Sequence, residues 1–496
     1  MDLLIQGFQV VFTPVTFAYI FIGTIVGVIF GAMPGVSATM AVVLAMTFSY
    51  SMAPLPSIAF LVAVYCAAIT GGGITAILFS IPGTPSSATT TFDGYPMSMR
   101  GEAGKALGIS LVTSAIGGFF SALCMFLLTP QLASAALKFG PSELFAVSFL
   151  GLSILTCLEE GNVIRTIASG LIGLWLACIG LDPIKGVARF TWGNVKLVKG
   201  VALIPVLIGL FAVTEVLKQL VKRNSVEGGK IESVSTKLMG LKEIWDMKVT
   251  VIRSAVIGTV VGILPGAGAT IASFLSYAIE VRCSKNPERY GKGEPRGVAA
   301  SETANNAATG GAMVPLLALG IPGGNAAAVM ATALAIKGVN MGPLLLTTQP
   351  VYMYTVFASM ILVNIIMVIV AVGIAKIFAK ILSIPYYMLG TIILMLSVLG
   401  AFSSSKATND VLLMVIAAII GYCFIKAKFN SAALILGLVL GPMCEKNFRN
   451  AVTLAKGSYS AAFLQKPITV VLLAVCITLF VYPILKPIFS KKKAVK

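Results

Sequence analysis

Long apolar runs separated by short polar segments make up most of this chain. Runs long enough to cross a bilayer as helices occur at residues 8–30, 57–80, 106–128, 143–180, 200–217, 250–279, 352–375, 386–402, 408–425 and 467–489. Some of these runs are long enough for more than one pass. The pattern predicts an all-α, polytopic membrane helix bundle. No basic residue precedes the first apolar run, so we expect that run to remain attached rather than to be cleaved as a signal peptide.

Two apolar stretches carry the same motifs in the same order. Residues 27–41 (GVIFGAMPGVSATMA) align without gaps to residues 258–272 (GTVVGILPGAGATIA), with seven of fifteen positions identical. Further along each half, the Ile-Pro-Gly motif at 81–83 corresponds to the one at 321–323. Helix-breaking residues at matching places in two halves of a hydrophobic chain indicate a transporter binding site. The alternative is that Gly and Pro only relieve packing between membrane helices.

The duplicated motifs predict two inverted structural repeats with re-entrant hairpins and broken helices. The expected breaks lie at Pro34, Pro82, Pro265 and Pro322. The predicted organisation is a first repeat at 1–217 (hairpin tip 31–37, broken helix 81–87), a cytoplasmic linker at 218–248, a second repeat at 249–465 (hairpin tip 262–268, broken helix 320–325), and an additional C-terminal helix with a basic tail at 466–496.

The distribution of charge predicts the inversion. Residues 1–99 contain no Lys or Arg, and their only charges are Asp2 and Asp93, whereas residues 218–253 carry eight basic and four acidic side chains. Basic loops favour the cytoplasm. The apolar stretch 249–281 lies between two basic segments and is too short for two crossings, which predicts a hairpin that enters from the cytoplasm and returns. Its counterpart in the first half has uncharged flanks and is expected to enter from the opposite face.

Two segments do not fit this topology. Residues 185–199 and residues 446–466 carry four basic side chains each, although the helix order would place both outside.

Composition excludes several classes of function. The 496 residues are 57% hydrophobic and 11% charged, which is typical of a membrane protein. The chain has no histidine, which excludes histidine-dependent proteases, HExxH zinc enzymes and imidazole proton relays. Its eight cysteines form no CxxC pair, and there is no nucleotide-binding P-loop. The net charge of +18 is interpreted as loop charge facing anionic membrane lipids, not as a nucleic-acid surface.

Each break frees backbone amides at the start of a half-helix, where the helix dipole favours an anion. The residues that follow the breaks are small, hydroxylic or amidic, and such groups suit a carboxylate. Any one of them could instead serve close helix packing. The predicted substrate-binding residues are Gly35, Ser37, Thr39, Gly83, Thr84, Ser86, Gly266, Gly268, Thr270, Gly323, Gly324 and Asn325.

The polar segment SETANNAATGG ahead of the second Ile-Pro-Gly motif is a candidate sodium site, because side-chain oxygens and freed carbonyls can hold that ion. Its predicted ligands are Thr303, Asn305, Asn306 and Thr309, although the asparagines could equally join helices. Glu302 and Asp93 are the acidic groups nearest the motifs. We expect Asp93 at the membrane interface, because Gly94-Tyr95-Pro96 is predicted to form a turn, and tyrosine is enriched where membrane meets water.

These motifs together resemble a known family. The segments GAMPGVSATM, IPGTPSSATTTFDGYPM with the following RGEAGKALG, GILPGAGATIASF and SETANNAATGGAMVPLLALGIPG, which span residues 27–325, resemble the large membrane subunit of the tripartite tricarboxylate transporters, the TctA family. The resemblance implies a secondary transporter of the bacterial inner membrane. It implies a small membrane subunit and a periplasmic solute-binding protein as partners, and uptake of citrate or related carboxylates on a cation gradient.

Other readings stay open on the residues alone. A solute-specific channel, a carboxylate carrier that needs no binding protein, and a membrane-embedded enzyme are the alternatives, and the last is disfavoured by the absence of histidine and of a nucleotide loop. No cofactor or resident metal is expected besides a transported coupling cation, for which we expect sodium. An elevator movement of the hairpin domain would suit two oppositely inserted hairpins. A homodimer would suit a transporter with a moving domain.

Overall fold

The computed structural model describes seven stretches of the chain: residues 2–33, 36–158, 163–182, 184–222, 241–266, 268–381 and 386–493. Within them the protein is almost wholly helical, with one pair of two-residue strands. Six helical segments of the described chain are long and apolar enough to cross a membrane: Pro14–Gly31, Pro54–Phe79, Ala103–Ala136, Leu203–Val221, Pro350–Ile374 and Thr408–Lys426. The prediction of an all-α polytopic membrane bundle is confirmed.

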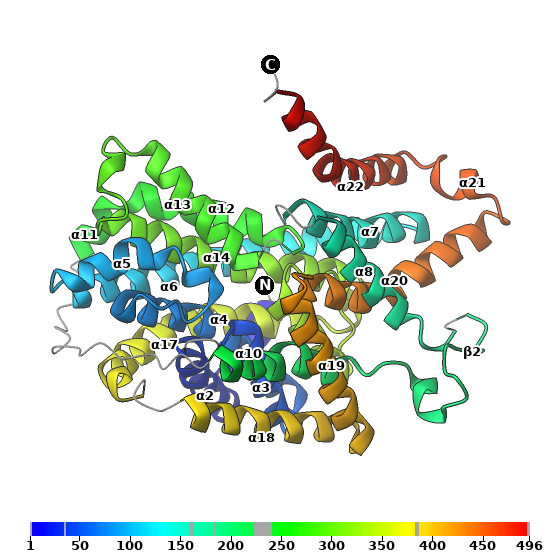
Figure 1. Ribbon diagram of the computed structural model, residues 1–496, viewed down its shortest axis with the longest axis horizontal. Coiled ribbons are helices and arrows are strands. Elements are labelled where there is room, and N and C mark those ends of the chain that lie inside the picture. The colour runs from blue at the N-terminus through cyan, green and yellow to red at the C-terminus, as the bar shows by residue number, and fades with distance from the viewer. Residues whose placement is uncertain are drawn as a thin grey trace.

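The first half contains the helices and strands shown from blue to green in Figure 1. They are α1 (Asp2–Val11), α2 (Pro14–Gly31), α3 (Ala38–Ser49), α4 (Pro54–Phe79), the 3-10 turn η1 (Pro85–Ser87), α5 (Thr90–Met99), α6 (Ala103–Ala136), α7 (Pro141–Leu158), α8 (Val163–Ala177), β1 (Gly180–Leu181), β2 (Ala188–Arg189), the 3-10 turn η2 (Val195–Lys199), α9 (Leu203–Leu207), the π-helical η3 (Ile208–Val213) and α10 (Thr214–Lys222).

The second half continues the chain to the C-terminal helix. Its elements are α11 (Leu241–Asp246), α12 (Lys248–Ile263), α13 (Gly268–Cys283), the 3-10 turn η4 (Pro287–Arg289), α14 (Pro295–Leu319), α15 (Asn325–Ile336), α16 (Leu345–Thr348), α17 (Pro350–Ile381), α18 (Tyr386–Ser405), α19 (Thr408–Lys426), α20 (Ser431–Leu454), α21 (Tyr459–Phe463) and α22 (Pro467–Lys493).

Helices α4 and α14 form the centre of the bundle, and α6 and α17 pack on them (Figure 1). Thr70 of α4 contacts Asn306 of α14, and Gly73 lies against Glu302 one turn further along, so the two helices run antiparallel. Both begin with a proline in the first turn, where its missing N–H costs nothing. Both helices also end just before an Ile-Pro-Gly motif. The residue between helix and motif has a left-handed backbone, Ser80 at φ 58° and Gly320 at φ 77°.

Glycines allow α2 to approach α4 closely. A side chain added at Gly27 would lie 2.6 Å from the carbonyl oxygen of Val64, and one added at Gly31 would collide with the carbonyl of Ala68. Glycine is needed here because backbone meets backbone, as it does in small-residue contacts between membrane helices.

Helix α12 approaches α14 in the same manner. Gly258 lies against the carbonyl of Ala304, and a side chain added at Gly262 would lie 2.6 Å from the carbonyl oxygen of Ala308. The alignment of the two halves pairs Gly258 with Gly27 and Gly262 with Gly31. The aligned glycines therefore make corresponding helix contacts.

Helices α12 and α13 lie antiparallel on either side of the Leu264–Gly266 turn. Near the start of α12, Thr250 donates to Glu280 near the end of α13 at 3.0 Å, and Arg253 forms an ion pair with the same carboxylate. The pair is thus a helical hairpin in its geometry.

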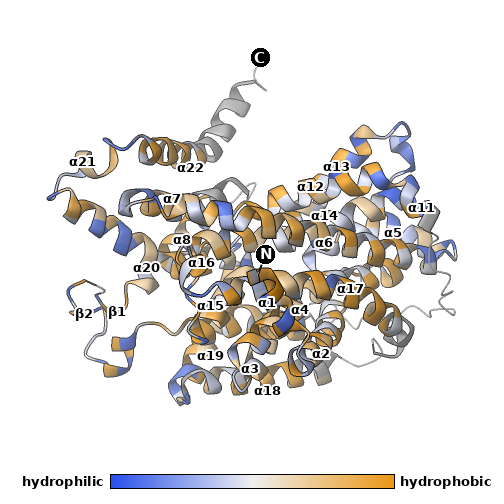
Figure 2. Ribbon diagram, turned by 180° about the vertical axis from the view of Figure 1, so that it is seen from behind, coloured by the Kyte–Doolittle hydropathy of each residue, from blue (hydrophilic) through white to orange (hydrophobic). Residues whose placement is uncertain are grey.

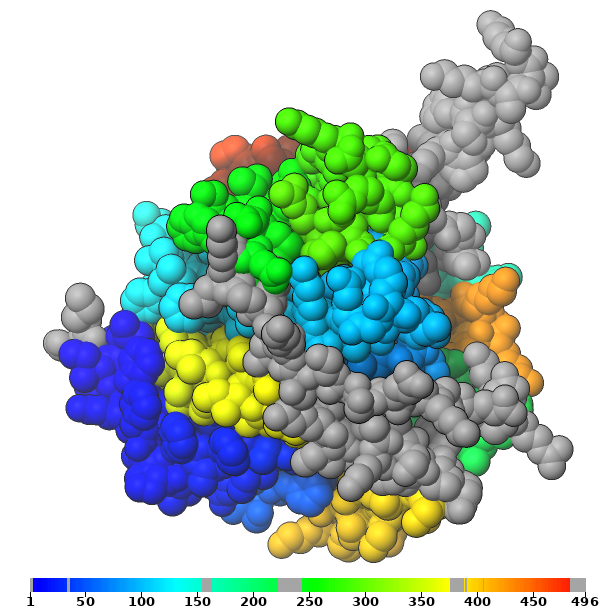
Figure 3. Space-filling model, turned by 90° about the vertical axis from the view of Figure 1, so that its left-hand side faces the viewer, coloured from blue at the N-terminus to red at the C-terminus, as the bar shows by residue number. Residues whose placement is uncertain are grey.

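The surface agrees with a protein surrounded mainly by lipid. Figure 2 shows hydrophobic residues along most helices and hydrophilic residues at helix ends and loops, such as the connection between α13 and α14. In Figure 3 the region of α5 and the start of α6 (light blue) lies directly against α12 and α13 (green). First-half and second-half segments therefore share this face of the molecule.

Candidate functional site

The two motif loops of the second half meet each other. The amide of Gly323 donates to the carbonyl of Ala312 at 3.3 Å, which folds the Ile-Pro-Gly loop back onto α14. The amide of Gly266 then donates to the carbonyl of Gly323 at 3.1 Å. Gly324 lies against Gly268, because a side chain added at Gly324 would be 3.7 Å from its Cα. Four of the predicted substrate-binding residues are thus brought together.

The first half has the corresponding loop contact. The amide of Gly83 donates to the carbonyl of Gly72 at 3.3 Å, and a side chain added at Gly83 would collide with the carbonyl of Gly31. Of the predicted residues here, Pro34 and Gly35 lie outside the described part of the chain. Gly83 therefore fastens the first Ile-Pro-Gly loop to both α4 and the end of α2.

Ser37 and Thr39 mark the start of α3. The Ser37 hydroxyl accepts a hydrogen bond from the amide of Met40 at 3.2 Å, so it caps the helix N-terminus. Thr39 follows in the first turn and is buried. Ser37 itself is half-buried.

Thr84 and Ser86 are buried and bonded to neighbouring hydroxyls. The Thr84 hydroxyl is 3.0 Å from that of Ser86 and 2.9 Å from that of Ser87. The group lies over Gly72 of α4, where a side chain would collide with Thr84. These hydroxyls already bond to one another, so a ligand could bind them only by replacing these hydrogen bonds.

The halves are joined by crossed contacts between their motif segments. The turn η1, which follows the first Ile-Pro-Gly loop, packs against α13 of the second half, and α15, which follows the second loop, packs against α3 of the first. The hydroxyls of Thr89 and Ser273 form a hydrogen bond across this contact. Thr270 lies in the first turn of α13 and Asn325 begins α15, and both are half-buried.

Three helices therefore start at the breaks: α3, α13 and α15. A helix N-terminus carries unpaired amides and about half a positive charge. The first residues of α13 and α15, Gly268 and Asn325, are half-buried, and helix starts of this kind suit an anionic ligand without a buried Lys or Arg.

A belt of polar side chains lies between α4, α6 and α14. The Thr70 hydroxyl donates to the side-chain oxygen of Asn306 at 2.7 Å, and the Asn306 amide donates to Ser114 at 2.8 Å and to Asn305 at 3.3 Å. Ser114 in turn donates to Glu302 at 3.1 Å. Two of the four predicted ion ligands, Asn305 and Asn306, therefore belong to one buried network.

The other two predicted ion ligands contribute differently. Thr309 donates its hydroxyl to the backbone carbonyl of Asn306 at 2.7 Å, one turn earlier on the same helix. Thr303 is fully buried, its hydroxyl makes no hydrogen bond, and its carbonyl lies against Gly117 of α6. Within the described residues, neither hydroxyl bonds to a side chain of the network around Asn306.

Asp93 corrects a sequence expectation. The predicted turn at residues 94–96 is wrong, because α5 continues as a helix from Thr90 to Met99. Asp93 is fully buried, and its carboxylate accepts from the amides of Gly293 and Glu294 and from the hydroxyl of Tyr277, each at 2.8 Å. These hydrogen bonds hold residues 293 and 294, which directly precede α14, against α5.

Sequence reasoning missed Thr70 and Ser114 as partners of the asparagines. Both stand in apolar helices of the first half, so only their polarity within α4 and α6 marked them. A polar residue in an apolar helix points to a polar contact only when the helix face that carries it is known to be buried in the bundle.

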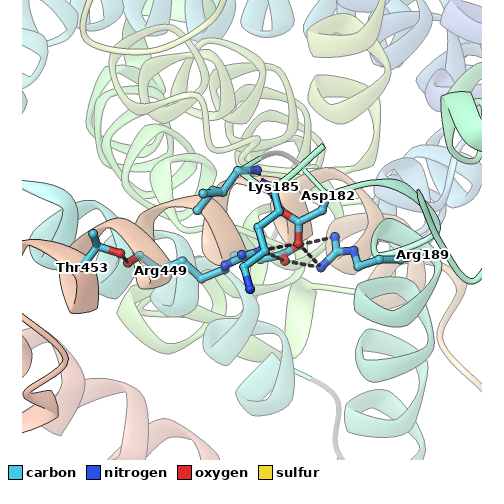
Figure 4. Close-up of polar contacts among 7 residues, drawn as sticks. Asp182, Lys185, Arg189, Arg449 and Thr453 are labelled. Atoms are coloured by element: carbon cyan, nitrogen blue, oxygen red, sulfur yellow. Dashed lines mark hydrogen bonds and ion pairs between the residues drawn. The ribbon is translucent and has the colours of Figure 1, made fainter. Parts of the chain in front are cut away.

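A cluster of charged side chains joins the regions of residues 185–199 and 446–466, the two basic segments that did not fit the predicted topology (Figure 4). Arg189 donates to the carboxylate of Glu445 from its two terminal guanidinium nitrogens, Nη1 at 2.5 Å and Nη2 at 2.9 Å. Arg449 contacts Asp182 at 2.6 Å and Glu445 at 3.1 Å. The 185–199 and 446–466 segments are therefore held together at one place. Arg189 and Glu445 also line a cavity of about 570 Å³ between α8, α15 and α20.

We predict that this cluster loses stabilising effect in acid. The backbone amide of Lys185, followed by the guanidinium of Arg449, lowers the pKa of Asp182 below its ordinary value. A group with a lowered pKa stabilises the fold above its unfolded pKa, about 4, and this contribution is lost as the pH falls through the folded pKa. Thermal unfolding of the wild type should show this loss, and Asp182→Asn should be less stable at neutral pH and less sensitive to acid. An unchanged acid dependence in Asp182→Asn would contradict it.

Comparison with known proteins gives a consistent picture. The family described as the tripartite tricarboxylate transporter TctA family matches residues 17–436. An Agrobacterium vitis protein described as an uncharacterised 52.8 kDa protein in the TAR-I ttuC' 3' region is 36% identical over 491 residues, covering 99% of this chain and 97% of that protein. Another from the same organism, described as an uncharacterised protein in the TAR-II ttuC' 3' region, is 36% identical over 238 residues, covering 48% of this chain and 98% of that protein. No solved structure matches the chain.

Proposed function

Because the chain belongs to the tripartite tricarboxylate transporter TctA family, and six of its described helical segments are long and apolar enough to cross a membrane, we propose that it is the large subunit of a carboxylate importer. Its substrate is a tricarboxylate such as citrate or a related carboxylate anion. It works as a secondary transporter in the bacterial inner membrane, together with a small membrane subunit and a periplasmic solute-binding protein. It is not an enzyme.

The observation that carries this proposal is the meeting of the second-half motif loops at the starts of α13 and α15. Gly266 donates to Gly323, so two helix N-termini begin beside each other at small residues. Both dipoles favour negative charge at that point. A multiply charged carboxylate accepts several amide and hydroxyl bonds at once, which matches the residues that follow the breaks.

The two halves are proposed to be inverted repeats that give alternating access. The antiparallel contact of α4 with α14 and the corresponding glycine contacts of α2 with α4 and of α12 with α14 support the repeat. Repeats of opposite orientation let one domain expose the same site to either side. We propose an elevator movement of the hairpins and broken helices.

Sodium is the proposed coupling cation. The support is the buried oxygen-rich belt around Asn305 and Asn306, because side-chain oxygens of this kind replace the water around a cation. Asn305 and Asn306 lie on α14, which leads directly into the second Ile-Pro-Gly loop. Binding at the belt would therefore act on the loop that is proposed to hold the carboxylate.

Uptake in proteoliposomes tests the function. The chain and its small membrane partner are reconstituted, and radiolabelled citrate is supplied with or without the binding protein, under a sodium gradient or without one. We expect accumulation only when the binding protein and the gradient are both present. Uptake without the binding protein would show a self-sufficient carrier, and unitary electrical currents would show a channel. Either result would overturn the proposal.

A further inference from the structure

The cavity between α8, α15 and α20 has a mainly apolar lining. Its volume of about 570 Å³ lies within the range of about 300–1,000 Å³ that small-ligand sites occupy. The segment that carries β1, β2 and η2 forms one wall. Apolar members of the lining include Leu176, Leu181, Val201, Ala335 and Leu438. Such a lining suits a hydrocarbon chain better than a carboxylate, which needs several hydrogen-bond donors.

Positive charge beside this cavity is not neutralised by the protein. The two arginines and two carboxylates of the cluster in Figure 4 pair with one another. Lys199 lines the cavity, and its side chain forms no ion pair or hydrogen bond in the described chain. On the same segment Lys185 is exposed, and Lys196 donates to the neutral side-chain oxygen of Asn409 at 2.9 Å. The segment can therefore attract an anion from outside the chain.

Three exposed aromatic rings adjoin the lining. Trp175 directly precedes a lining residue of α8, and Phe190 directly follows one in β2. The Trp175 ring lies 6.3 Å from the ring of Phe190 and 6.4 Å from that of Trp192. The three side chains are 47%, 49% and 70% exposed, in that order. They form an apolar surface next to the cavity.

The backbone is strained where it presents two of these rings. Phe190 and Trp192 have left-handed backbone, at φ 50° and 45°. This conformation is unfavourable for residues other than Gly, Asn and Asp. Because both rings stay exposed, burial within the described chain does not offset the strain, which indicates a contact with another molecule.

The aromatic surface continues the outward side of α8. Ile164, Leu171 and Trp175 are exposed along one side of this apolar helix, whereas Gly173 packs against the carbonyl of Leu434 in α20. In a membrane protein, lipid covers such an apolar side, and tryptophan is enriched where lipid head groups meet water. Lipid is therefore the molecule that this surface suits.

We propose that the cavity binds one anionic phospholipid, with an acyl chain in the apolar part and the head-group phosphate at Lys199. The rings of Trp175, Phe190 and Trp192 pack on the rest of the lipid. Basic pockets between membrane helices bind such head groups. This gives the basic segment at 185–199, which did not fit the predicted topology, a role in holding lipid. The site is separate from the proposed carboxylate site.

Fluorescence quenching tests the site without transport. The full chain carrying Trp245→Phe, in which Trp175 and Trp192 are the remaining tryptophans, is reconstituted in phosphatidylcholine vesicles with a small fraction of brominated lipid. Bromine on the acyl chains quenches tryptophans that the lipid contacts. The brominated lipid is either anionic phosphatidylglycerol or phosphatidylcholine with the same chains. We expect greater quenching by phosphatidylglycerol, because it collects at the site. Equal quenching would overturn the proposal and leave this surface to a protein partner.

Two variants separate the charge from the cavity. Lys199→Gln removes the cation for the head group, and Ala335→Phe fills the apolar part. Both positions are exposed, so neither variant removes a packed side chain. Each should lose the excess quenching by phosphatidylglycerol, whereas Lys285→Gln, at an exposed lysine after α13, should keep it. Excess quenching that survives in either of the first two variants would overturn the site.

Citrate distinguishes the lipid from the transported anion. Added against sodium chloride of equal ionic strength, citrate should leave the excess quenching unchanged. Relief by citrate alone would assign Lys199 to the path of the carboxylate and overturn the lipid site. Since this readout needs no uptake, a failure of the proposed transport function would be seen separately.

Discussion

Replacement of Gly323 by alanine is expected to abolish carboxylate uptake. The added Cβ would lie 2.5 Å from the Cα of Ala312 and 2.6 Å from the carbonyl oxygen of Gly262. Both atoms belong to the main chain, so neither can turn aside as a flexible side chain does. The Ile-Pro-Gly loop would have to move, and the bond from the Gly266 amide to the Gly323 carbonyl would be lost with it.

The expected loss of stability follows from overpacking. Forcing an extra methyl group into a closely packed site costs about 1–3 kcal/mol. The loss of uptake should exceed the loss of folded protein, because the displaced loop is the one proposed to hold the substrate. Gly83→Ala should act in the same way, since its Cβ would collide with the carbonyl of Gly31.

Gly373→Ala is the matched control. Gly373 lies in α17, where an added Cβ would meet no atom of another element among the described residues within 4 Å, and alanine is the better helix former. Uptake per folded transporter, measured with all three variants in proteoliposomes, should be unchanged only in this one. Wild-type uptake by Gly323→Ala would contradict the geometry of the loop.

Replacement of Asp93 by alanine is expected to cause the largest loss of stability. It removes a buried charged acceptor from the amides of Gly293 and Glu294 and from the hydroxyl of Tyr277. Leaving a buried hydrogen-bond donor without its acceptor costs about 1–3 kcal/mol, and three donors lose their acceptor here. Thermal unfolding of the purified full chain should show a large drop in midpoint temperature.

Two further variants should lose less stability than Asp93→Ala. Asp93→Asn retains one oxygen for the two amides, and its NH₂ group can donate to the Tyr277 hydroxyl, so it should lose less. Tyr277→Phe removes one hydrogen bond, worth about 1 kcal/mol. The expected order of midpoints is Tyr277→Phe and Asp93→Asn above Asp93→Ala. Equal midpoints for wild type and Asp93→Ala would show that the segment before α14 does not depend on this carboxylate.

The sequence could predict the features that depend on local chemistry. Apolar runs and sparse charge predicted the all-α membrane bundle, and the structure confirms it. Proline and glycine mark chain breaks directly, so the positions at which α4 and α14 end were visible in the motifs. The inversion of the halves rests on loop charges and stays a prediction.

Contacts between distant helices could not be predicted in the same way. Thr90, Ser114 and Glu302 are far apart in the chain, and no local rule places their side chains at one point. The turn at residues 94–96 failed because the residues were judged by local propensity, whereas α5 is held as a helix by its burial against α4, α6 and α14. Tertiary packing decided both cases.

The most direct test of the central claim, that both halves contribute to one carboxylate site, is substrate protection of two engineered cysteines. Ser37→Cys and Thr270→Cys each place a thiol in the segment that follows a Pro-Gly motif, and both positions are half-buried. Labelling by a maleimide is followed peptide by peptide, with the exposed native Cys283 as an internal control. Citrate with sodium should slow labelling at positions 37 and 270 and leave Cys283 unchanged. Protection at neither position, or at one alone, would contradict a site shared by the two halves.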